Sequence, residues 1–261
     1  PSVADLQAAG HLVACDLYSV PPSALPNMQG VKKRAGDYAV GAMADRYQAA
    51  AVMGEVVGSY RRHAKGRPGI VFACNIDHSK ALRDSFRKAG FTAEHIDGST
   101  PHERRAETLR GLSDGAVDVV CSVAVLTEGF DCPRVSYVGV ARSTASTALW
   151  LQIIGRGLRP CAGKDRCVVI DHGANYRQHG LPEDARQWSL DGRAPKVKDK
   201  ADSARSCPHC LAVYCPKTHP SRCPRCGKAN EKKREIKTDE SAQIRKITPE
   251  MRAAYSKIPP Q

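Results

Sequence analysis

Aromatic side chains and long apolar runs are both scarce in this chain of 261 residues. Phe, Trp and Tyr make up only 5% of it, which disfavours an aromatic-rich β-sandwich and favours an α/β domain packed with Ala, Val and Leu. No apolar run approaches the roughly 18 to 20 residues that a membrane span needs. The first residues also lack the basic region and cleavage site of a signal peptide. We therefore expect a cytoplasmic protein that makes no membrane contact.

Acidic residues are too few to balance the basic ones, and the imbalance is concentrated toward the C-terminus. Residues 1–190 hold 23 basic and 19 acidic side chains, whereas residues 191–261 hold 17 and 8. A polycationic segment of this kind favours a polyanionic partner, of which nucleic acid is the first candidate. The alternative interpretation is a solvated basic tail without a partner.

Cysteine is plentiful, and four of the 11 cysteines form two CxxC pairs separated by 12 residues. Two such pairs on a short loop can place four thiolates around one metal ion, so Cys207, Cys210, Cys223 and Cys226 are predicted zinc ligands. A redox CxxC is disfavoured, because neither pair opens a helix after a core strand. Other metal-binding side chains in the same span are interpreted as bystanders, namely His209, Cys215 and His219. Other cysteines, such as Cys74, Cys121 and Cys167, lie in predicted strands and are expected to pack in the core.

Short apolar strands alternate with amphipathic helices along residues 69–173. Strands are predicted at 69–74, 91–96, 117–123, 135–141 and 167–173, with helices between them. Strands that are apolar on both faces are typical of a parallel sheet covered by helices on both sides. The sequence therefore predicts a five-stranded α/β domain.

Composition divides the chain into five parts. Residues 1–38 contain a proline-rich connector and are interpreted as a linker that enters the domain. The α/β domain is assigned to residues 39–180, and a polar linker without periodicity to 181–206. The four-cysteine module occupies 207–228, and a basic tail occupies 229–261.

Two loop segments have the side chains that catalytic sites use. In VLTEGFDCP (125–133), Gly129 permits close backbone approach and Asp131 offers a carboxylate, although a plain tight turn would look the same. In QIIGRGLRP (152–160), Arg156 and Arg159 are three residues apart and are expected to project from one face at a helix end. Either segment alone is a weak signal.

Polar and glycine residues follow the ends of several predicted strands, where ligands of open parallel sheets bind. Thr100, with Pro101 and Glu103 after it, predicts a capping box whose free N–H groups could accept a phosphate. Because such contacts read the backbone and not the bases, we expect binding without sequence preference. For each residue an ordinary cap or turn is the alternative. The candidate nucleic-acid contacts are Asn75, Gly98, Ser99, Thr100, Ser122 and Thr127.

Four segments in this order resemble the second RecA-like domain of superfamily 2 helicases. IVFACNIDHS (70–79), HIDGSTPHER (95–104), VLTEGFDCP and QIIGRGLRP look like motifs IV, IVa, V and VI of that family. The residues of these motifs are most similar to those of the branch that contains type III restriction translocases and UvrB-like, phage and RadD-type helicases. A zinc module after the motor domain is also similar to RadD-type proteins.

The resemblance implies an ATP-dependent DNA helicase or translocase that acts with a preceding RecA-like domain. Arg156 and Arg159 would be arginine fingers, which stabilise charge on a transferring phosphoryl group. Family precedent gives Gly129, Asp131 and Gln152 to the nucleotide and the domain interface. The implied partners are single-stranded or branched DNA and a repair or replication protein, in the nucleoid of a bacterial or phage-infected cell. The implied cofactors are ATP with Mg²⁺, together with zinc.

The phosphate loop GxxxxGK[ST] and the acidic Mg²⁺-binding motif of complete helicases do not occur in the sequence. We therefore expect this chain to be the C-terminal part of a longer protein and unable to hydrolyse ATP alone. The alternative function is a nonenzymatic nucleic-acid- or protein-binding module built on a degenerate RecA fold. The motor of a restriction system is a third possibility, although no nuclease constellation is apparent.

Overall fold

The computed structural model describes residues 2–34, 36–47, 50–123, 125, 131–186 and 204–230. Pro1–Asn230 form one compact unit. The predicted basic tail lies outside the described residues, apart from its first two positions, and so does most of the predicted linker at 181–206.

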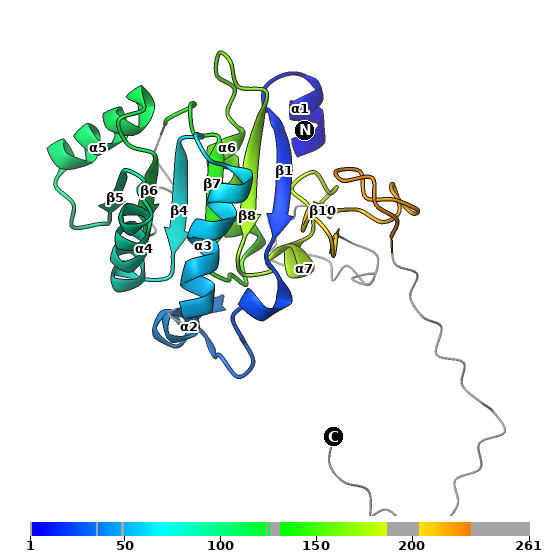
Figure 1. Ribbon diagram of the computed structural model, residues 1–261, viewed down its shortest axis with the longest axis horizontal. Coiled ribbons are helices and arrows are strands. Elements are labelled where there is room, and N and C mark those ends of the chain that lie inside the picture. Colours follow the sequence, from blue (N-terminus) through cyan, green and yellow to red (C-terminus); the bar gives the residue numbers. More distant parts are fainter. Residues whose placement is uncertain are drawn as a thin grey trace, which may run out of the picture. The chain divides into compact units, whose positions relative to one another are not determined.

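A six-stranded parallel sheet forms the centre of this unit (Figure 1). The strand order is β1-β8-β7-β4-β6-β5. Each strand is short, and β4, β6 and β7 are buried along their whole length. This agrees with the predicted RecA-like parallel sheet. The strands are β1 (Ala14–Ser19), β4 (Gly69–Ala73), β5 (Ala93–Ile96), β6 (Val119–Ser122), β7 (Tyr137–Ala141) and β8 (Arg166–Asp171).

Helices follow the strands as the sequence predicts, and side-chain caps fix where several of them begin. Asn75 accepts a hydrogen bond from the His78 N–H at the start of α4, and Ser146 accepts one from the Leu149 N–H at the start of α6. Within the described segments, no helix has the length and apolar character required to cross a membrane. The helices are α1 (Val3–Ala8), α2 (Val40–Tyr47), α3 (Ala50–His63), α4 (Ile76–Lys88), α5 (His102–Asp114), α6 (Thr147–Leu158) and α7 (Tyr176–His179), with the 3-10 turn η1 (Pro22–Ala24).

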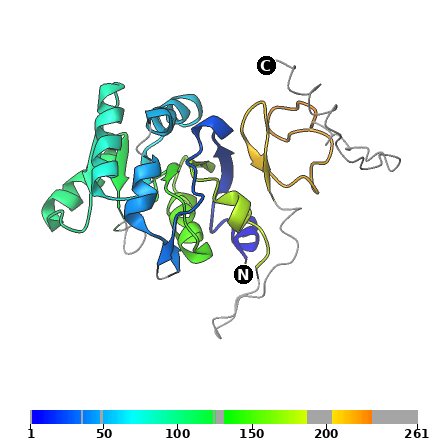
Figure 2. The ribbon, with the colours of Figure 1, turned by 90° about the horizontal axis from the view of Figure 1, so that it is seen from below.

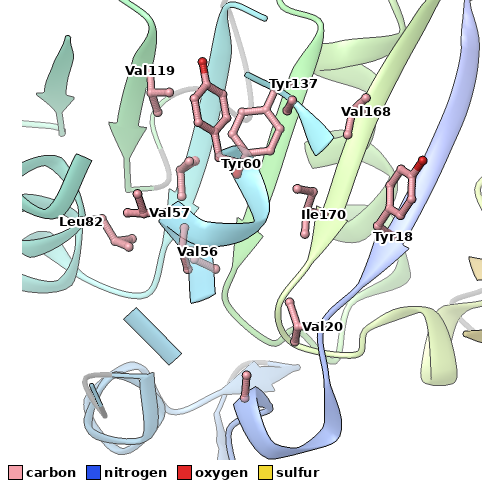
Figure 3. Close-up of a cluster of buried hydrophobic side chains, with 14 of the residues drawn as sticks. Tyr18, Val20, Val56, Val57, Tyr60, Leu82, Val119, Tyr137, Val168 and Ile170 are labelled. Atoms are coloured by element: carbon pink, nitrogen blue, oxygen red, sulfur yellow. The ribbon is translucent and has the colours of Figure 1, made fainter. Parts of the chain in front are cut away.

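Both faces of the sheet are covered by helices, and each face has its own apolar cluster (Figures 1 and 2). Helices α3 and α4 cover one face, where Tyr60 packs against Tyr137 of β7 with ring centroids 4.9 Å apart (Figure 3). Helix α6 covers the other face, and its Trp150, Ile153 and Ile154 are fully buried there. Burial on both sides explains why the strands read as continuous apolar runs and not as alternating ones.

Strand β1 lies within residues 1–38, which the sequence predicts as a linker. The prediction of a linker and of five strands is therefore wrong at this point. Ala14–Ser19 pair in parallel with β8 along its whole length, so the sheet has six strands. The Asp16 carboxylate anchors the added strand through an ion pair with Arg166 at 3.0 Å. Pairing with a strand about 150 residues later is a tertiary contact that local sequence pattern does not carry.

The connector after β1 also has structure. It passes through η1 and then forms a two-stranded hairpin of β2 (Lys33–Arg34) and β3 (Asp37–Tyr38). Asp37 fastens this hairpin to the loop after β7, because its carboxylate pairs with the Arg142 guanidinium at 2.7 Å and accepts from the Ala145 N–H at 2.7 Å. The segment that the sequence predicts as a linker therefore forms part of the domain.

The predicted capping box at Thr100 does not form. Helix α5 begins at His102 with Pro101 at the cap position and no side-chain cap. The Thr100 hydroxyl instead accepts a hydrogen bond from the backbone N–H of Asp97 at 2.9 Å. The local turn at 97–100 thus takes up the hydroxyl that a capping box would need.

The cysteine module packs on the outer edge of β1. Its small hairpin of β9 (Arg205–Ser206) and β10 (Val213–Tyr214) is followed by a loop, which the structure describes as far as residue 230. The Ser19 N–H donates to the Leu211 carbonyl at 2.9 Å, so this contact uses the otherwise open edge of the sheet. Arg225 adds an ion pair with Asp16 at 2.6 Å and a hydrogen bond to the Tyr18 hydroxyl at 2.9 Å.

Close packing of α6 on the sheet predicts opposite effects for two glycines of the same helix. A Cβ at Gly157 would lie 2.3 Å from the Cys167 Sγ and 2.7 Å from a Val138 methyl carbon, whereas a Cβ at Gly155 would meet no atom within 4 Å. We expect Gly157→Ala to lower the free energy of unfolding by about 1 to 3 kcal/mol through overpacking. The matched control Gly155→Ala should raise it by up to about 1 kcal/mol. Urea unfolding measures both, and equal changes would contradict the packing argument.

Candidate functional site

Parallel strands place the candidate residues at two opposite edges of the sheet. Each connection leaves the carboxyl end of one strand and returns to the amino end of the next, so a covering helix carries the chain from one edge to the other. Helix α6 begins with Ser146 after β7 and ends near Arg159 before β8. Its two ends therefore belong to different sites.

A compact charged cluster lies at the amino edge, in front of β7 and β8. The Arg159 guanidinium pairs with the Asp131 carboxylate at 2.5 Å. Beneath them, the Lys164 ammonium donates to the carbonyls of Pro133, Val135 and Arg159 at 2.8, 2.5 and 2.7 Å. Burial lowers the pKa of Lys164. This lysine ties the loop after Asp131 to the end of α6, and the sequence analysis did not identify it.

Gln152, Arg156 and Arg159 follow one another along α6 at spacings of four and three residues, which places them along one side of the helix. Gln152 is exposed, and the two arginines are partly exposed. Gly157 faces the other way, toward the sheet. The predicted pair of arginines is therefore displayed at the surface at the end of the helix, as the spacing indicates.

The position of Asp131 differs from what the sequence suggests. Its segment, 125–133, follows the predicted strand at 117–123, so the sequence predicts this carboxylate near the carboxyl ends of the strands. The structure places the Asp131 carboxylate at the opposite edge, on Arg159. Gly129 and Thr127 lie outside the described residues. Among the described residues of this segment, Asp131 belongs to the charged cluster with Arg159 and Lys164.

The predicted nucleic-acid contacts that the structure describes lie at the carboxyl edge. Asn75 caps α4, so its side-chain oxygen is occupied by the His78 N–H at 2.8 Å. Gly98 and Ser99 are exposed, and Thr100 is partly exposed. Ser122 is fully buried and its hydroxyl has no hydrogen-bond partner among the described residues. In this conformation, Ser122 does not reach the surface where a strand would bind.

Asp97 holds the exposed turn at 98–100 in place. Its carboxylate accepts hydrogen bonds from the N–H and hydroxyl of Ser99 at 2.8 and 2.7 Å, and it contacts the His95 ring at 2.9 Å. The bonds from Ser99 and His95 hold the pKa of Asp97 well below its usual value. Asp97 is not among the site residues predicted from the sequence, although an Asp before Gly-Ser-Thr is a typical turn signal.

The four predicted metal ligands converge. The sulfur atoms of Cys207, Cys210, Cys223 and Cys226 all lie within 4.8 Å of one another. Two of the separations, Cys207 to Cys226 and Cys210 to Cys223, are 3.7 Å. A tetrahedral ion with metal–sulfur bonds of about 2.3 Å requires separations of about 3.8 Å. The thiols therefore fit zinc in both number and spacing.

Comparison with known proteins gives a family match at residues 49–161, to the family described as "Helicase conserved C-terminal domain". This part of the chain therefore matches a helicase C-terminal domain, which supports the expected similarity to superfamily 2 helicases. The match covers strands β4 to β7 and helix α6, together with the arginine cluster up to Arg159. Strands β1 and β8 complete the sheet of this helicase domain from outside the matched range.

Three curated proteins illustrate the similarity. A "51.5 kDa protein" of a Lactococcus phage is 31% identical over 166 residues, which is 62% of this chain and 36% of the phage protein. The putative mitochondrial ATP-dependent helicase irc3 of Schizosaccharomyces pombe is 33% identical over 131 residues, 50% of this chain and 22% of that protein. UvrABC system protein B of Chlorobium limicola is 32% identical over 118 residues, 42% and 17% of the two chains. The chain thus spans about a third or less of these relatives.

Within the cysteine module, hydrogen bonds favour thiolate formation at one of the four clustered cysteines. Burial alone would oppose ionisation of Cys207, but N–H groups of Cys210 and His209 donate to its sulfur and lower its pKa below the usual value. The turns after the two CxxC pairs are equivalent, because Leu211 and Gly227 both have a positive φ, of 62° and 70°. Cys215 and His219 do not belong to the ligand cluster found among the described residues.

Outside the module, the three cysteines predicted to lie in strands behave as core residues. Cys74, Cys121 and Cys167 are buried, as the sequence predicts. Burial raises the pKa of Cys74 and Cys167 to about 12. These thiols are therefore protonated at neutral pH and pack like small apolar side chains.

Buried polar groups lie beneath the carboxyl edge of the helicase domain, and the sequence analysis did not identify them as a group. Burial raises the pKa of Asp171 to about 6, although its carboxylate accepts from Tyr176 N–H at 2.9 Å and from Asn175 Nδ2 at 2.8 Å. Burial lowers the pKa of His172 to about 3 and that of His78 to about 4. Both imidazoles are therefore neutral in the folded protein at neutral pH.

The neutral histidines predict an acid-sensitive fold. The folded-state pKa of His172 lies below its ordinary value of 6.5, so the unfolded chain binds the proton first and stability is lost as the pH falls below about 6.5. At pH 5 this contribution reaches about 2 kcal/mol. We expect His172→Gln to lose less stability than the wild type between pH 7 and pH 5, measured by urea unfolding.

Asp171 changes the free energy of unfolding in the opposite direction to His172 as the pH falls. The prediction therefore concerns the difference in this free energy between the wild type and His172→Gln. The raised pKa of Asp171 makes it a source of stability as the pH falls from about 6 toward 4, and it is present in both proteins. Parallel stability curves for wild type and His172→Gln would contradict a neutral, buried His172.

Proposed function

We propose that this chain is the C-terminal motor domain of an ATP-dependent DNA helicase or translocase and supplies the arginine side of its ATP site. The cluster at the end of α6 carries the proposal. Arg156 and Arg159 project there, the Asp131 carboxylate contacts Arg159, and Lys164 fixes the backbone beneath them. The similarity to a protein named as an ATP-dependent helicase supports the nucleotide that we assign.

The chemistry explains why guanidinium groups at the end of a rigid helix suit this role. Phosphoryl transfer is accelerated mainly by positioning and by stabilising charge on the γ-phosphate. A planar guanidinium binds phosphate oxygens in a fixed geometry. Mg²⁺ and the phosphate loop would belong to a preceding RecA-like domain, and the described residues here would add Gln152, Asp131 and the two arginines at the interface.

The Arg159–Asp131 ion pair gives the proposed finger a resting position. A carboxylate at 2.5 Å holds the guanidinium at the surface without burying it, since the Arg159 side chain is 36% and the Asp131 side chain 74% exposed. A pair this exposed contributes little stability. A phosphate can therefore take over the guanidinium at small energetic expense, which is what an arginine that engages only in the closed state requires.

The nucleic-acid track is assigned to the carboxyl edge of the sheet, whereas the arginines lie at the amino edge. The exposed turn Gly98–Thr100 and the capping residue Asn75 offer small polar groups to a sugar-phosphate backbone. Ser122 and Thr127 remain predictions, since the first is buried and the second is outside the described residues. The resemblance of the motif sequences to DNA helicases favours single-stranded or branched DNA as the substrate.

The cysteine module is assigned one zinc ion, held by the four convergent thiolates. Its contact with β1 makes the metal a structural element of the motor domain. Basic side chains around the ligands also suit contact with nucleic acid or with a repair or replication protein.

Loss of the Arg159 guanidinium is expected to abolish ATP turnover. In the protein that joins this chain to its phosphate-loop domain, Arg159→Ala should lower DNA-stimulated kcat by about 10³-fold or more, because charge on the γ-phosphate loses its partner. The Kd for single-stranded DNA should change by less than about twofold. ATPase assays and fluorescence anisotropy measure the two quantities.

Arg110→Ala is the matched control, because Arg110 is an exposed arginine on α5 away from the cluster. It should leave kcat unchanged. Normal turnover in Arg159→Ala would refute the finger assignment. Absence of ATP turnover in the wild-type protein would instead support a nonenzymatic binding module.

Metal analysis of the purified chain should find about one zinc per molecule. Cys223→Ser should lose that zinc and unfold the module, because a unit of this size has too small a core to fold without its metal. Elemental analysis and resistance of the 205–230 region to proteolysis report the two effects.

Cys215→Ser is the control, since Cys215 lies in the same span but outside the ligand cluster. It should keep full zinc content. Equal loss of zinc in both variants, or a metal-free wild type with an intact module, would contradict the assignment.

A further inference from the structure

A polar cavity at the carboxyl edge has no role in the function proposed above. Its volume is about 680 Å³, within the range of specific ligand sites. We call it the edge pocket. Its walls come from the connector after β1 (22–28), the β2–β3 hairpin (33 and 38), the loop after β7 (143–144) and the loop after β8 (173–178).

One wall of the edge pocket is fixed by buried hydrogen bonds. The Asn175 side chain donates to the Arg142 carbonyl at 2.9 Å and accepts from the Thr144 N–H at 2.8 Å, joining the loops after β7 and β8. Ala174, which directly precedes Asn175 in the loop after β8, has a φ of 51°, in the left-handed region that non-glycine residues rarely adopt. Strained backbone that is held in place by such bonds is concentrated at binding sites.

Gly173 shows how closely this wall is packed. A Cβ at this position would lie 2.6 Å from the Tyr47 hydroxyl and 2.8 Å from the Arg142 carbonyl oxygen. The loop after β8 therefore approaches the loop after β7 to a distance that only glycine permits. The surface that both loops present to the edge pocket is fixed before any ligand arrives.

The hairpin forms the opposite wall and is held by a different anchor. Asp37 pairs with Arg142 at 2.7 Å, and the two side chains are 22% and 11% exposed. This pair places Tyr38 and Lys33 on the edge pocket, where the Lys33 ammonium lies 5.3 Å from the centre of the Tyr38 ring. A preformed pocket loses less free energy on ordering its ligand contacts.

The charge of the edge pocket selects an anion. Lys33 and Arg177 line it and are exposed, and no Asp or Glu is present among the described residues that line it. Asp37, the nearest carboxylate on the hairpin, is already paired with Arg142. Tyr38 and Met28 add aromatic and apolar surface, and the exposed Gln178 adds a neutral hydrogen-bonding group. Two cations that share a pocket with an aromatic ring suit a phosphodiester with its sugar and base.

We propose that the edge pocket binds a segment of the single-stranded nucleic acid, with phosphates on Lys33 and Arg177 and a sugar or base against Tyr38. The inference rests on the proposed function, which assigns a strand to the same edge of the sheet. Asn75 and Gly98–Thr100 follow β4 and β5, whereas the edge pocket lies after β1, β7 and β8. With strands about 4.8 Å apart, the six-stranded sheet spreads this track over about 24 Å.

Binding of fluorescein-labelled oligo(dT) to the full chain tests the proposal by anisotropy across a salt series. The double variant Lys33→Gln/Arg177→Gln should bind about fivefold or more weakly at 0.1 M salt, and its log Kd against log salt slope should fall by about 1.4, or 0.7 for each lost phosphate contact. Lys88→Gln/Arg110→Gln is the matched control with the same change of charge on exposed residues away from the pocket. It should keep the wild-type slope.

Photo-crosslinking supplies a second measurement that general electrostatics does not affect. Oligo(dT) with 4-thiothymidine should crosslink to peptides containing residues 33–38 or 173–178, and the pocket variant should lose these crosslinks. Circular dichroism melting of each variant should match the wild type, since the changed side chains are exposed.

The outcomes separate this proposal from the proposed function. If the wild type binds oligo(dT) but both double variants lose affinity and slope equally, or the crosslinks fall only elsewhere, the edge pocket is not part of the track and is left for a protein partner. If the wild type does not bind oligo(dT) at all, the nucleic-acid function itself fails.

Discussion

Parallel strand pairing is the constraint on which the arrangement of this domain depends. Since parallel strands all point the same way, every connection must carry the chain back across a face of the sheet, and helices buried on both faces do so. Helix α6 crosses in this way, from Ser146 at the carboxyl edge to Arg159 at the amino edge. Its approach to the sheet requires a glycine at 157, because any Cβ there would overlap Cys167. The arginines are therefore presented on a helix with little freedom to move relative to the sheet.

The same pairing leaves an open edge at β1, and the cysteine module covers it. Asp16 links both elements, since its carboxylate pairs with Arg166 on the neighbouring strand and with Arg225 in the module. Leu211 has strained backbone with a φ of 62°, and its carbonyl accepts the Ser19 N–H of the edge strand. The module is thus joined to the sheet by backbone as well as by charge, and an intact metal site would help to keep β1 in register.

Polar groups beneath the carboxyl edge give that edge a fixed shape. Asp171 and Asn175 connect the loops after β7 and β8, and Asp97 fixes the turn at 98–100 in a comparable way. The Asp97 and Asp171 carboxylates accept hydrogen bonds from the loops that directly follow them in the chain. They position glycine, serine and backbone groups at the surface, which suits recognition of a sugar-phosphate chain and not of individual bases.

The sequence by itself determined the alternating α/β pattern, the partly exposed pair Arg156 and Arg159, and the clustering of the four cysteines, because each depends on spacing within a short segment. Only the tertiary structure decided which strands pair and which edge each loop reaches. β1 joined the sheet through contacts with residues far along the chain, and Asp131 moved to the opposite edge from its neighbours in sequence. Lys164 acquired its role only when three separate carbonyls met around it. Local pattern records the period of an element, whereas long-range pairing depends on which surfaces can be buried together.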